Sequence, residues 1–285
     1  MNTLPAQHKR VPPLFDDRRT SIEPPGLWAA AGFITLYFLL QAVVSGLIAM
    51  LMGLFTGYVQ MDRGIEPVGA EIRTMLDQSG MPAILVMLTL GVVTAILLPM
   101  VRRKWPLLWN QAMPPGLGVV LPMNPIFFAL AVIVGLTAPL VGGLLTALLA
   151  HGGTVTQDIQ DLGLQTPLAL RIVLVVVVAS LGPIVEELLF RGVLLSALMQ
   201  PALMRPALMQ RWRTGWSIAI SALLFALVHL PSMQWQWYAL PDLALLAAAL
   251  AWLRLRSGSL WPAVLAHGIN NLLAVVVWFA AAAIA

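Results

Sequence analysis

Long apolar runs alternate along this chain with short polar segments that carry most of the charges. An α-helix needs about 20 apolar residues to cross the hydrocarbon core of a bilayer. Seven runs are candidates for such crossings: 26–55, 82–101, 125–150, 168–198, 214–230, 242–253 and 260–283. The pattern therefore predicts an all-α, polytopic transmembrane helix bundle, because a helix satisfies its own backbone polar groups within the lipid.

The fourth run leaves the number of crossings open, and one apolar connection is not expected to cross. The fourth run, 168–198, is longer than one crossing at about 1.5 Å per residue, and it contains Gly182-Pro183. A break at this proline, which removes a backbone donor, would give eight crossings instead of seven. The connection 105–124 is apolar but contains four prolines and two glycines, so we expect it to lie along the membrane surface rather than to cross.

Composition and charge support a multi-pass integral membrane protein. Hydrophobic residues make up 60% of the chain and charged residues 10%, whereas about a quarter of a soluble domain is charged. The net charge of +4 reflects basic clusters in the tail and in alternate loops, as expected when cytoplasmic loops retain lysine and arginine. This distribution predicts a cytoplasmic N-terminus in a bacterial inner (plasma) membrane and argues against a nucleic-acid partner. The clusters are Lys9, Arg10, Arg18, Arg19; Arg102, Arg103, Lys104; Arg205, Arg211, Arg213; and Arg254, Arg256.

The segment 181–195, LGPIVEELLFRGVLL, places two glutamates and an arginine in an otherwise apolar run. Ionisable side chains are costly inside a membrane and usually mark a functional site. Glu187 and Arg191 are four residues apart with the acid first, the favourable order for a helical ion pair. Such a pair leaves Glu186, about 100° away around the helix, free to act as a general base. A structural ion-pair cluster of all three residues is the competing interpretation.

Two histidines in later apolar runs extend this set. His229 follows Phe225 by four residues, which places an aromatic ring on the histidine's face of its helix. His267 precedes Asn271 by four residues, so that an imidazole and a carboxamide share one face of the last helix. Asn270 is a weaker alternative to Asn271.

These residue types together favour hydrolysis. Glu186 and His229 can hold and deprotonate a water, and His267 and Asn271 can donate hydrogen bonds to a developing oxyanion. The same residues could instead bind zinc through Glu186, His229 and His267. Each ligand would come from a different helix, unlike the single-helix HExxH motif of soluble zinc proteases. The chain has no cysteine, which excludes disulfides, thiolate metal sites and cysteine nucleophiles.

Three segments resemble, in the right order, the motifs of the CPBP family, which comprises CAAX prenyl endopeptidases and bacteriocin-processing intramembrane proteases. GPIVEELLFRG, at 182–192, resembles its glutamate-glutamate-x-x-x-arginine motif. FALVH, at 225–229, is similar to its second motif, and HGINN, at 267–271, to its third. The resemblance covers about residues 168–273 and leaves the first three runs without a recognised motif.

The resemblance implies an intramembrane endopeptidase that hydrolyses a peptide bond. Glu186 and His229 would activate the water, and His267 and Asn271 would form the oxyanion side. The supporting residues would be Glu187, Arg191 and Phe225. We expect no cofactor, because the amide of Asn271 suits an oxyanion better than it suits zinc. The expected partners are the lipid bilayer and a peptide or protein substrate, for which the resemblance suggests a prenylated CAAX peptide.

Two other functions are compatible with the sequence. A membrane scaffold or immunity protein of the same fold would use the cavity to bind a partner without catalysis. A transporter would use the glutamate pair as a proton relay, but no inverted repeat is visible to support this. On the leading interpretation the chain has three regions: a polar cytoplasmic tail (1–25), an N-terminal transmembrane region without motifs (26–166) and a catalytic CPBP-like transmembrane core (167–285).

Overall fold

The computed structural model of this protein describes residues 23–62, 80–151, 162, 166–200 and 212–282. Within these ranges every regular element is a helix, which confirms the all-α prediction. The long helices are α1 (Leu27–Asp62), α3 (Met81–Lys104), α4 (Ile126–Leu149), α6 (Leu168–Glu187), α9 (Arg213–His229), α10 (Leu240–Ser257) and α11 (Trp261–Ala282). A π-helical segment, η2 (Leu188–Leu194), and the short α7 (Leu195–Leu198) continue α6. The 3-10 turns η4 (Pro231–Met233) and η5 (Trp237–Ala239) connect α9 to α10.

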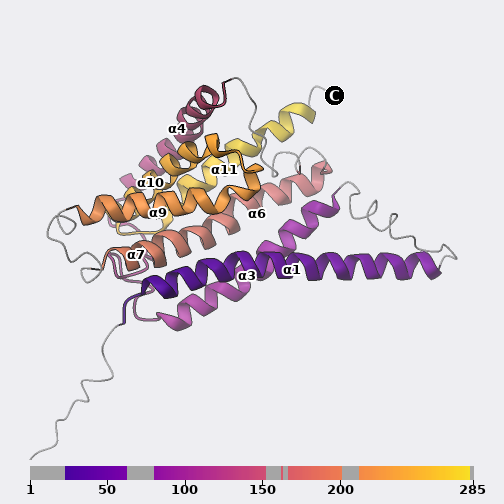
Figure 1. The fold of residues 1–285 in the computed structure, drawn as a ribbon, viewed down its shortest axis with the longest axis horizontal. Helices are drawn as coiled ribbons and strands as arrows, with labels where there is room; N and C mark the ends of the chain where they lie inside the picture. The colour runs from indigo at the N-terminus through magenta and orange to yellow at the C-terminus, as the bar shows by residue number, and fades with distance from the viewer. Residues whose placement is uncertain (1–22, 63–79, 152–161, 163–165, 201–211, 283–285) are drawn as a thin grey trace, which may run out of the picture.

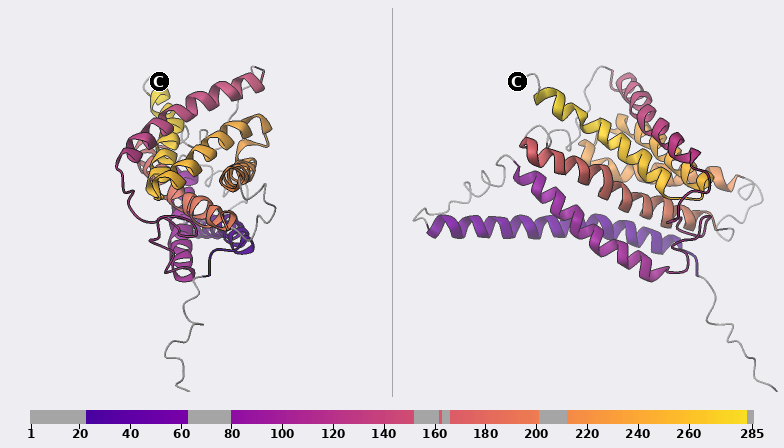
Figure 2. Two further views of the ribbon diagram at one scale, coloured as in Figure 1. Left: turned by 90° about the vertical axis from the view of Figure 1, so that its left-hand side faces the viewer. Right: turned by 180° about the vertical axis from the view of Figure 1, so that it is seen from behind.

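The helices pack against one another in a series, with the continuation of α6 at the centre (Figure 1). Helix α3 lies between α1 and α6, α11 lies between α6 and α4, and α10 lies between α4 and α9. The π-helical segment η2 contacts α1 on one side and α9 and α10 on the other. The C-terminal half of α1 extends beyond the other helices, as both Figure 1 and the right-hand view of Figure 2 show. A residue at the end of α6 can therefore meet side chains from both halves of the chain.

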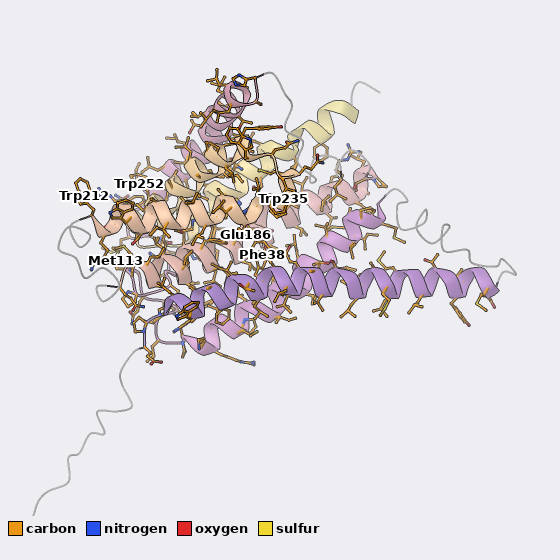
Figure 3. The ribbon with its side chains drawn as sticks, viewed as in Figure 1. Phe38, Met113, Glu186, Trp212, Trp235 and Trp252 are labelled. Carbon is orange, nitrogen blue, oxygen red and sulfur yellow. The ribbon has the colours of Figure 1, made fainter. Side chains whose placement is uncertain are left out.

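Five helical segments are long and apolar enough to cross a membrane: Leu27–Val59, Met81–Lys104, Ile126–Leu149, Leu168–Leu198 and Trp237–Ser257. Helix α9 is apolar but shorter. Two exposed tryptophans, Trp212 and Trp235, lie just before and just after it (Figure 3), as interfacial aromatic residues often do. The protein is thus an integral membrane protein, and the count of seven or eight crossings stays a prediction.

Two helices differ in extent from those predicted, and the break that was considered in a third is absent. Helix α1 runs to Asp62 rather than ending near residue 55, because extending a formed helix gains one hydrogen bond per residue. Pro183 lies inside α6, and the helical path continues without interruption to Leu198. The split that would have produced an eighth crossing is therefore absent at this position. Helix α10 extends beyond the predicted 242–253 at both ends. Pro241 lies in its first turn, where proline is tolerated, and Gly258 ends the helix with a φ of 66°.

The expectation of a surface-lying connection at 105–124 is wrong for its middle part. Leu108 and Leu117 are buried there in the main hydrophobic core. Arg254, which the charge pattern placed in a basic loop, is fully buried at the end of α10. Its guanidinium donates hydrogen bonds of 2.6 and 2.7 Å to the carbonyl oxygens of Ala112 and Gly116. The connection folds inward because this buried arginine satisfies carbonyls that water would otherwise satisfy. Of the predicted cytoplasmic tail, residues 1–22 lie outside the described residues.

Candidate active site

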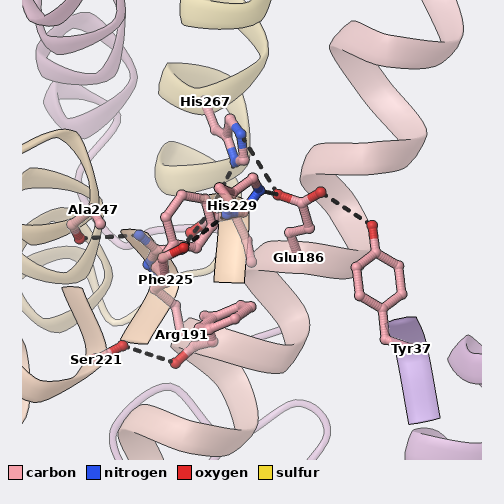
Figure 4. Close-up of polar contacts among 10 residues, drawn as sticks. Tyr37, Glu186, Arg191, Ser221, Phe225, His229, Ala247 and His267 are labelled. Carbon is pink, nitrogen blue, oxygen red and sulfur yellow. Dashed lines mark hydrogen bonds and ion pairs between the residues drawn. The ribbon is translucent and has the colours of Figure 1, made fainter. Parts of the chain in front are cut away.

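The ends of α6 and α9 and the middle of α11 bring three predicted site residues together (Figure 4). Oε2 of Glu186 lies 3.5 Å from Nε2 of His229 and 3.8 Å from Nε2 of His267. All three side chains line a cavity of about 220 Å³, together with Phe225 and Asn271. Residues that are separated by up to 85 positions in the sequence thus share one polar space, inside a bundle whose other surfaces are mainly apolar.

The glutamate–arginine motif spans the change from α-helix to π-helix. Glu187 is the last residue of α6, and Arg191 lies within η2. In a π-helix the hydrogen bonds join residues five apart, and such turns occur frequently at functional sites. The carbonyl of Phe190 accepts the i+5 bond from Leu195, and the hydroxyl of Ser221 on α9 lies 3.5 Å from the same oxygen. The π-turn thereby brings α9 against the motif.

Gly192 allows the motif to pack closely against the inward-folded connection. A Cβ at this position would lie 3.4 Å from the carbonyl oxygen of Leu117 and 3.2 Å from a methyl group of Leu188. These distances are at or below the lower limit of ordinary van der Waals contact. The glycine of the motif therefore serves packing, whereas the charged residues serve the polar site.

Glu187 and Arg191 form the predicted i,i+4 ion pair, with Nη1 of Arg191 2.9 Å from Oε1 of Glu187 and both side chains 0% exposed. Arg191 also donates a 3.0 Å hydrogen bond to the carbonyl of Ala247 on α10. Its guanidinium carbon lies 4.5 Å from the centre of the Phe225 ring, a geometry that favours a cation–π interaction. Arg191 therefore links the π-turn to α9 and α10.

The hydrogen bonds made by the two Nδ1 atoms define how the imidazoles are oriented. Nδ1 of His229 lies 2.7 Å from the carbonyl oxygen of Phe225, and Nδ1 of His267 lies 2.8 Å from Oε1 of Glu187. A carbonyl oxygen and a carboxylate paired with arginine only accept, so both Nδ1 atoms carry a proton. Each histidine consequently directs Nε2 towards Glu186 and the cavity.

The remaining two predicted residues occupy the same cavity. The Phe225 ring centre lies 4.4 Å from that of His229 and 5.7 Å from that of His267, so Phe225 forms an apolar wall behind both imidazoles. Asn271 donates a 3.2 Å hydrogen bond from Nδ2 to the carbonyl of Val178 on α6. A carboxamide has two N–H groups, and one of them remains for a ligand. Asn270 lines the cavity as well.

Sequence reasoning missed one polar contact of Glu186. The hydroxyl of Tyr37 on α1 donates a 3.0 Å hydrogen bond to Oε1 of the glutamate, as the dashed line in Figure 4 shows. A single tyrosine in an apolar run resembles the aromatic residues that commonly face lipid headgroups. The contact joins residues 149 positions apart, so only the arrangement in space could reveal it.

The zinc alternative required Glu186, His229 and His267 to act as a ligand set. Among the residues that the structure describes, no group of three or more histidine, aspartate or glutamate side chains is arranged to hold a metal ion. The expectation of a site without a metal stays a prediction.

One comparison with known proteins covers this site. Residues 168–273 match the family model described as type II CAAX prenyl endopeptidase Rce1-like. Neither a curated protein nor a solved structure matches the chain. The matched segment contains all three motifs, and its limits are those that the motifs predicted. This match supports the assignment of residues 168–273 to the CPBP/CAAX protease family.

Proposed function

We propose that this protein is an intramembrane endopeptidase that hydrolyses a peptide bond with a water activated by Glu186 and His229. The observation that carries this proposal is the approach of Oε2 of Glu186 to Nε2 of both histidines, at 3.5 and 3.8 Å, in one cavity. A carboxylate inside a membrane without a full ion pair is energetically costly, and such groups usually mark a functional site. Glu187, by contrast, has its charge compensated by the ion pair with Arg191.

In the proposed reaction a water lies between Oε2 of Glu186 and Nε2 of His229. This pair takes one proton as the water oxygen forms a bond to the carbonyl carbon of the substrate. The proton then passes to the amide nitrogen, the C–N bond breaks, and the products are a carboxylic acid and an amine. Placing the water within reach of both groups removes much of the entropic barrier to this attack.

The oxyanion formed in this step would accept hydrogen bonds from Nε2–H of His267 and from Nδ2–H of Asn271. Because Nδ1 of His267 already donates to Glu187, donation from Nε2 requires the doubly protonated imidazolium. In this proposal Glu187 and Arg191 therefore act by orienting His267.

The proposed substrate is a peptide that reaches the cavity from the membrane, and a prenylated CAAX peptide is the class that the family suggests. Apolar side chains, including Val178, Leu243 and Leu246, line the cavity beside the polar groups. Such a lining suits a chain that carries apolar side chains next to its scissile bond.

The test is incubation of the purified full-length protein with prenylated CAAX peptides and a membrane-peptide library, read by mass spectrometry. Glu186→Ala should lower kcat at least about 100-fold, in the range of general-base catalysis, with an unchanged melting temperature. Asp62→Ala, which alters an exposed carboxylate at the end of α1, is the control and should cleave like the wild type. Undiminished cleavage by Glu186→Ala would refute the proposal. A wild type that cleaves nothing yet binds a partner would favour the scaffold function.

A further inference from the structure

Tyr37 lies on α1, 131 residues before the segment that matches the protease family. Its side chain is only 2% exposed, and its hydroxyl donates to Oε1 of Glu186 next to the place where α1 contacts η2, the continuation of α6. Among the described residues, the polar partners of Glu186 from the matched segment are His229 and His267. Tyr37 is its donor from the N-terminal half of the chain.

This contact divides the two oxygens of the Glu186 carboxylate between two sets of partners. Oε1 accepts from Tyr37 at 3.0 Å, whereas Oε2 faces Nε2 of His229 and of His267. A glutamate side chain rotates broadly about its last torsion when nothing holds it. A hydrogen bond from the tyrosine hydroxyl to Oε1 opposes this rotation while Oε2 faces the cavity.

Packing alone does not explain a tyrosine at this position. The ring makes an edge-on contact with Phe38 at 5.0 Å between centres, and a phenylalanine ring could make the same contact. The hydroxyl is the only group that distinguishes the two residues, and a buried hydroxyl needs a partner. The side chain of Gln41 is one partner of this hydroxyl. The other is the charged Glu186, and hydrogen bonds to charged groups are stronger than those between neutral groups.

We propose that Tyr37 is a positioning residue that holds Glu186 in the orientation required for hydrolysis, which makes α1 part of the active site. This inference rests on the proposed function. The Rce1-like segment on this account contains the reacting groups but lacks one of the residues that orient them. The tyrosine touches neither the substrate nor the water, and it acts through Glu186.

The test uses the full-length protein with Tyr37→Phe and, as a matched control, Tyr58→Phe on the same helix, where the side chain is 71% exposed. In Tyr37→Phe, kcat should fall about 10- to 100-fold, as for the loss of a hydrogen bond to a charged group. KM should remain within about twofold, because the substrate does not touch the hydroxyl. Replacing Tyr37 with 4-aminophenylalanine, which keeps a donor at this place, should restore part of kcat. Tyr58→Phe should behave like the wild type.

Infrared spectroscopy supplies a readout that does not depend on cleavage. The carboxylate band of Glu186 is identified by its loss in Glu186→Ala, and it should shift in Tyr37→Phe but not in Tyr58→Phe. An unchanged band and an unchanged kcat would overturn the role of Tyr37, as would equal losses of activity in the Phe and aminophenylalanine variants. A shifted band in a protein that cleaves no peptide would instead refute the protease proposal and leave the contact intact.

Discussion

Gly268 follows His267 on α11, at the point where this helix packs against α6. A Cβ at position 268 would overlap the carbonyl oxygen of Ala179 on α6. A backbone carbonyl inside a helix cannot move away as a side chain can, so Gly268→Ala must push α11 away from α6. Overpacking of this kind costs about 1–3 kcal/mol. The displacement would also change the 3.8 Å separation between His267 and Glu186, and a misplacement of about 1 Å can lower a reaction rate about 100-fold.

We therefore expect Gly268→Ala to unfold at a lower temperature or denaturant concentration than the wild type and to lose more than nine tenths of its kcat. Gly182→Ala on α6 is the control, because a Cβ there would meet nothing within 4 Å, and alanine is a better helix former than glycine by about 1 kcal/mol. Unfolding would be followed by tryptophan fluorescence in detergent, and cleavage by mass spectrometry. A Gly268→Ala variant as stable and as active as the wild type would refute the close packing of α11 on α6.

Three other changes test the ion pair, the absence of a metal step and the inward-folded connection. Glu187→Gln leaves the buried charge of Arg191 without its carboxylate and should lower the free energy of unfolding by about 3–5 kcal/mol, measured by chemical denaturation; a loss below about 1 kcal/mol would contradict the buried pair. Chelators should leave cleavage unchanged, and atomic absorption should find far less than one zinc per protein; stoichiometric zinc that cleavage requires would establish the metal alternative. Arg254→Met removes the hydrogen bonds to two loop carbonyls and should speed proteolysis within 105–124, whereas Arg256→Met, at an exposed position, should not.

Helical spacing alone predicted the local part of this site. Residues four apart lie on one face of a helix, and this rule anticipated both the pair of Glu187 with Arg191 and the ring of Phe225 beside His229. The cost of ionisable groups in lipid then indicated that residues on three separate helices would share one place. Those inferences need only the sequence, because neighbouring turns and membrane burial dominate them.

Contacts between distant segments lay beyond such reasoning. Tyr37 belongs to an apolar run with no distinguishing pattern, and the 105–124 connection has the proline content of a surface loop. Arg254 resembled a loop cation that marks the cytoplasmic side, yet it is buried and binds this connection. The π-turn was equally hidden, since its sequence, LLFRGVL, contains no proline and no pattern that distinguishes it from an α-helix. Tyr37 and Arg254 each bind a partner more than 130 positions away in the sequence.

The two adjacent glutamates illustrate how helix geometry assigns different tasks to identical side chains. Successive residues point about 100° apart around a helix, so the end of α6 presents Glu187 to the arginine of the π-turn and Glu186 to the cavity. Glu187 is neutralised within the protein, and it also accepts a hydrogen bond from His267. Glu186 is held from the opposite side, where α1 rather than the family segment supplies the donor. On the proposed function, the hydrolytic site of this protein would therefore draw on helices on both sides of α6, and α1 from the N-terminal region without motifs would be one of them.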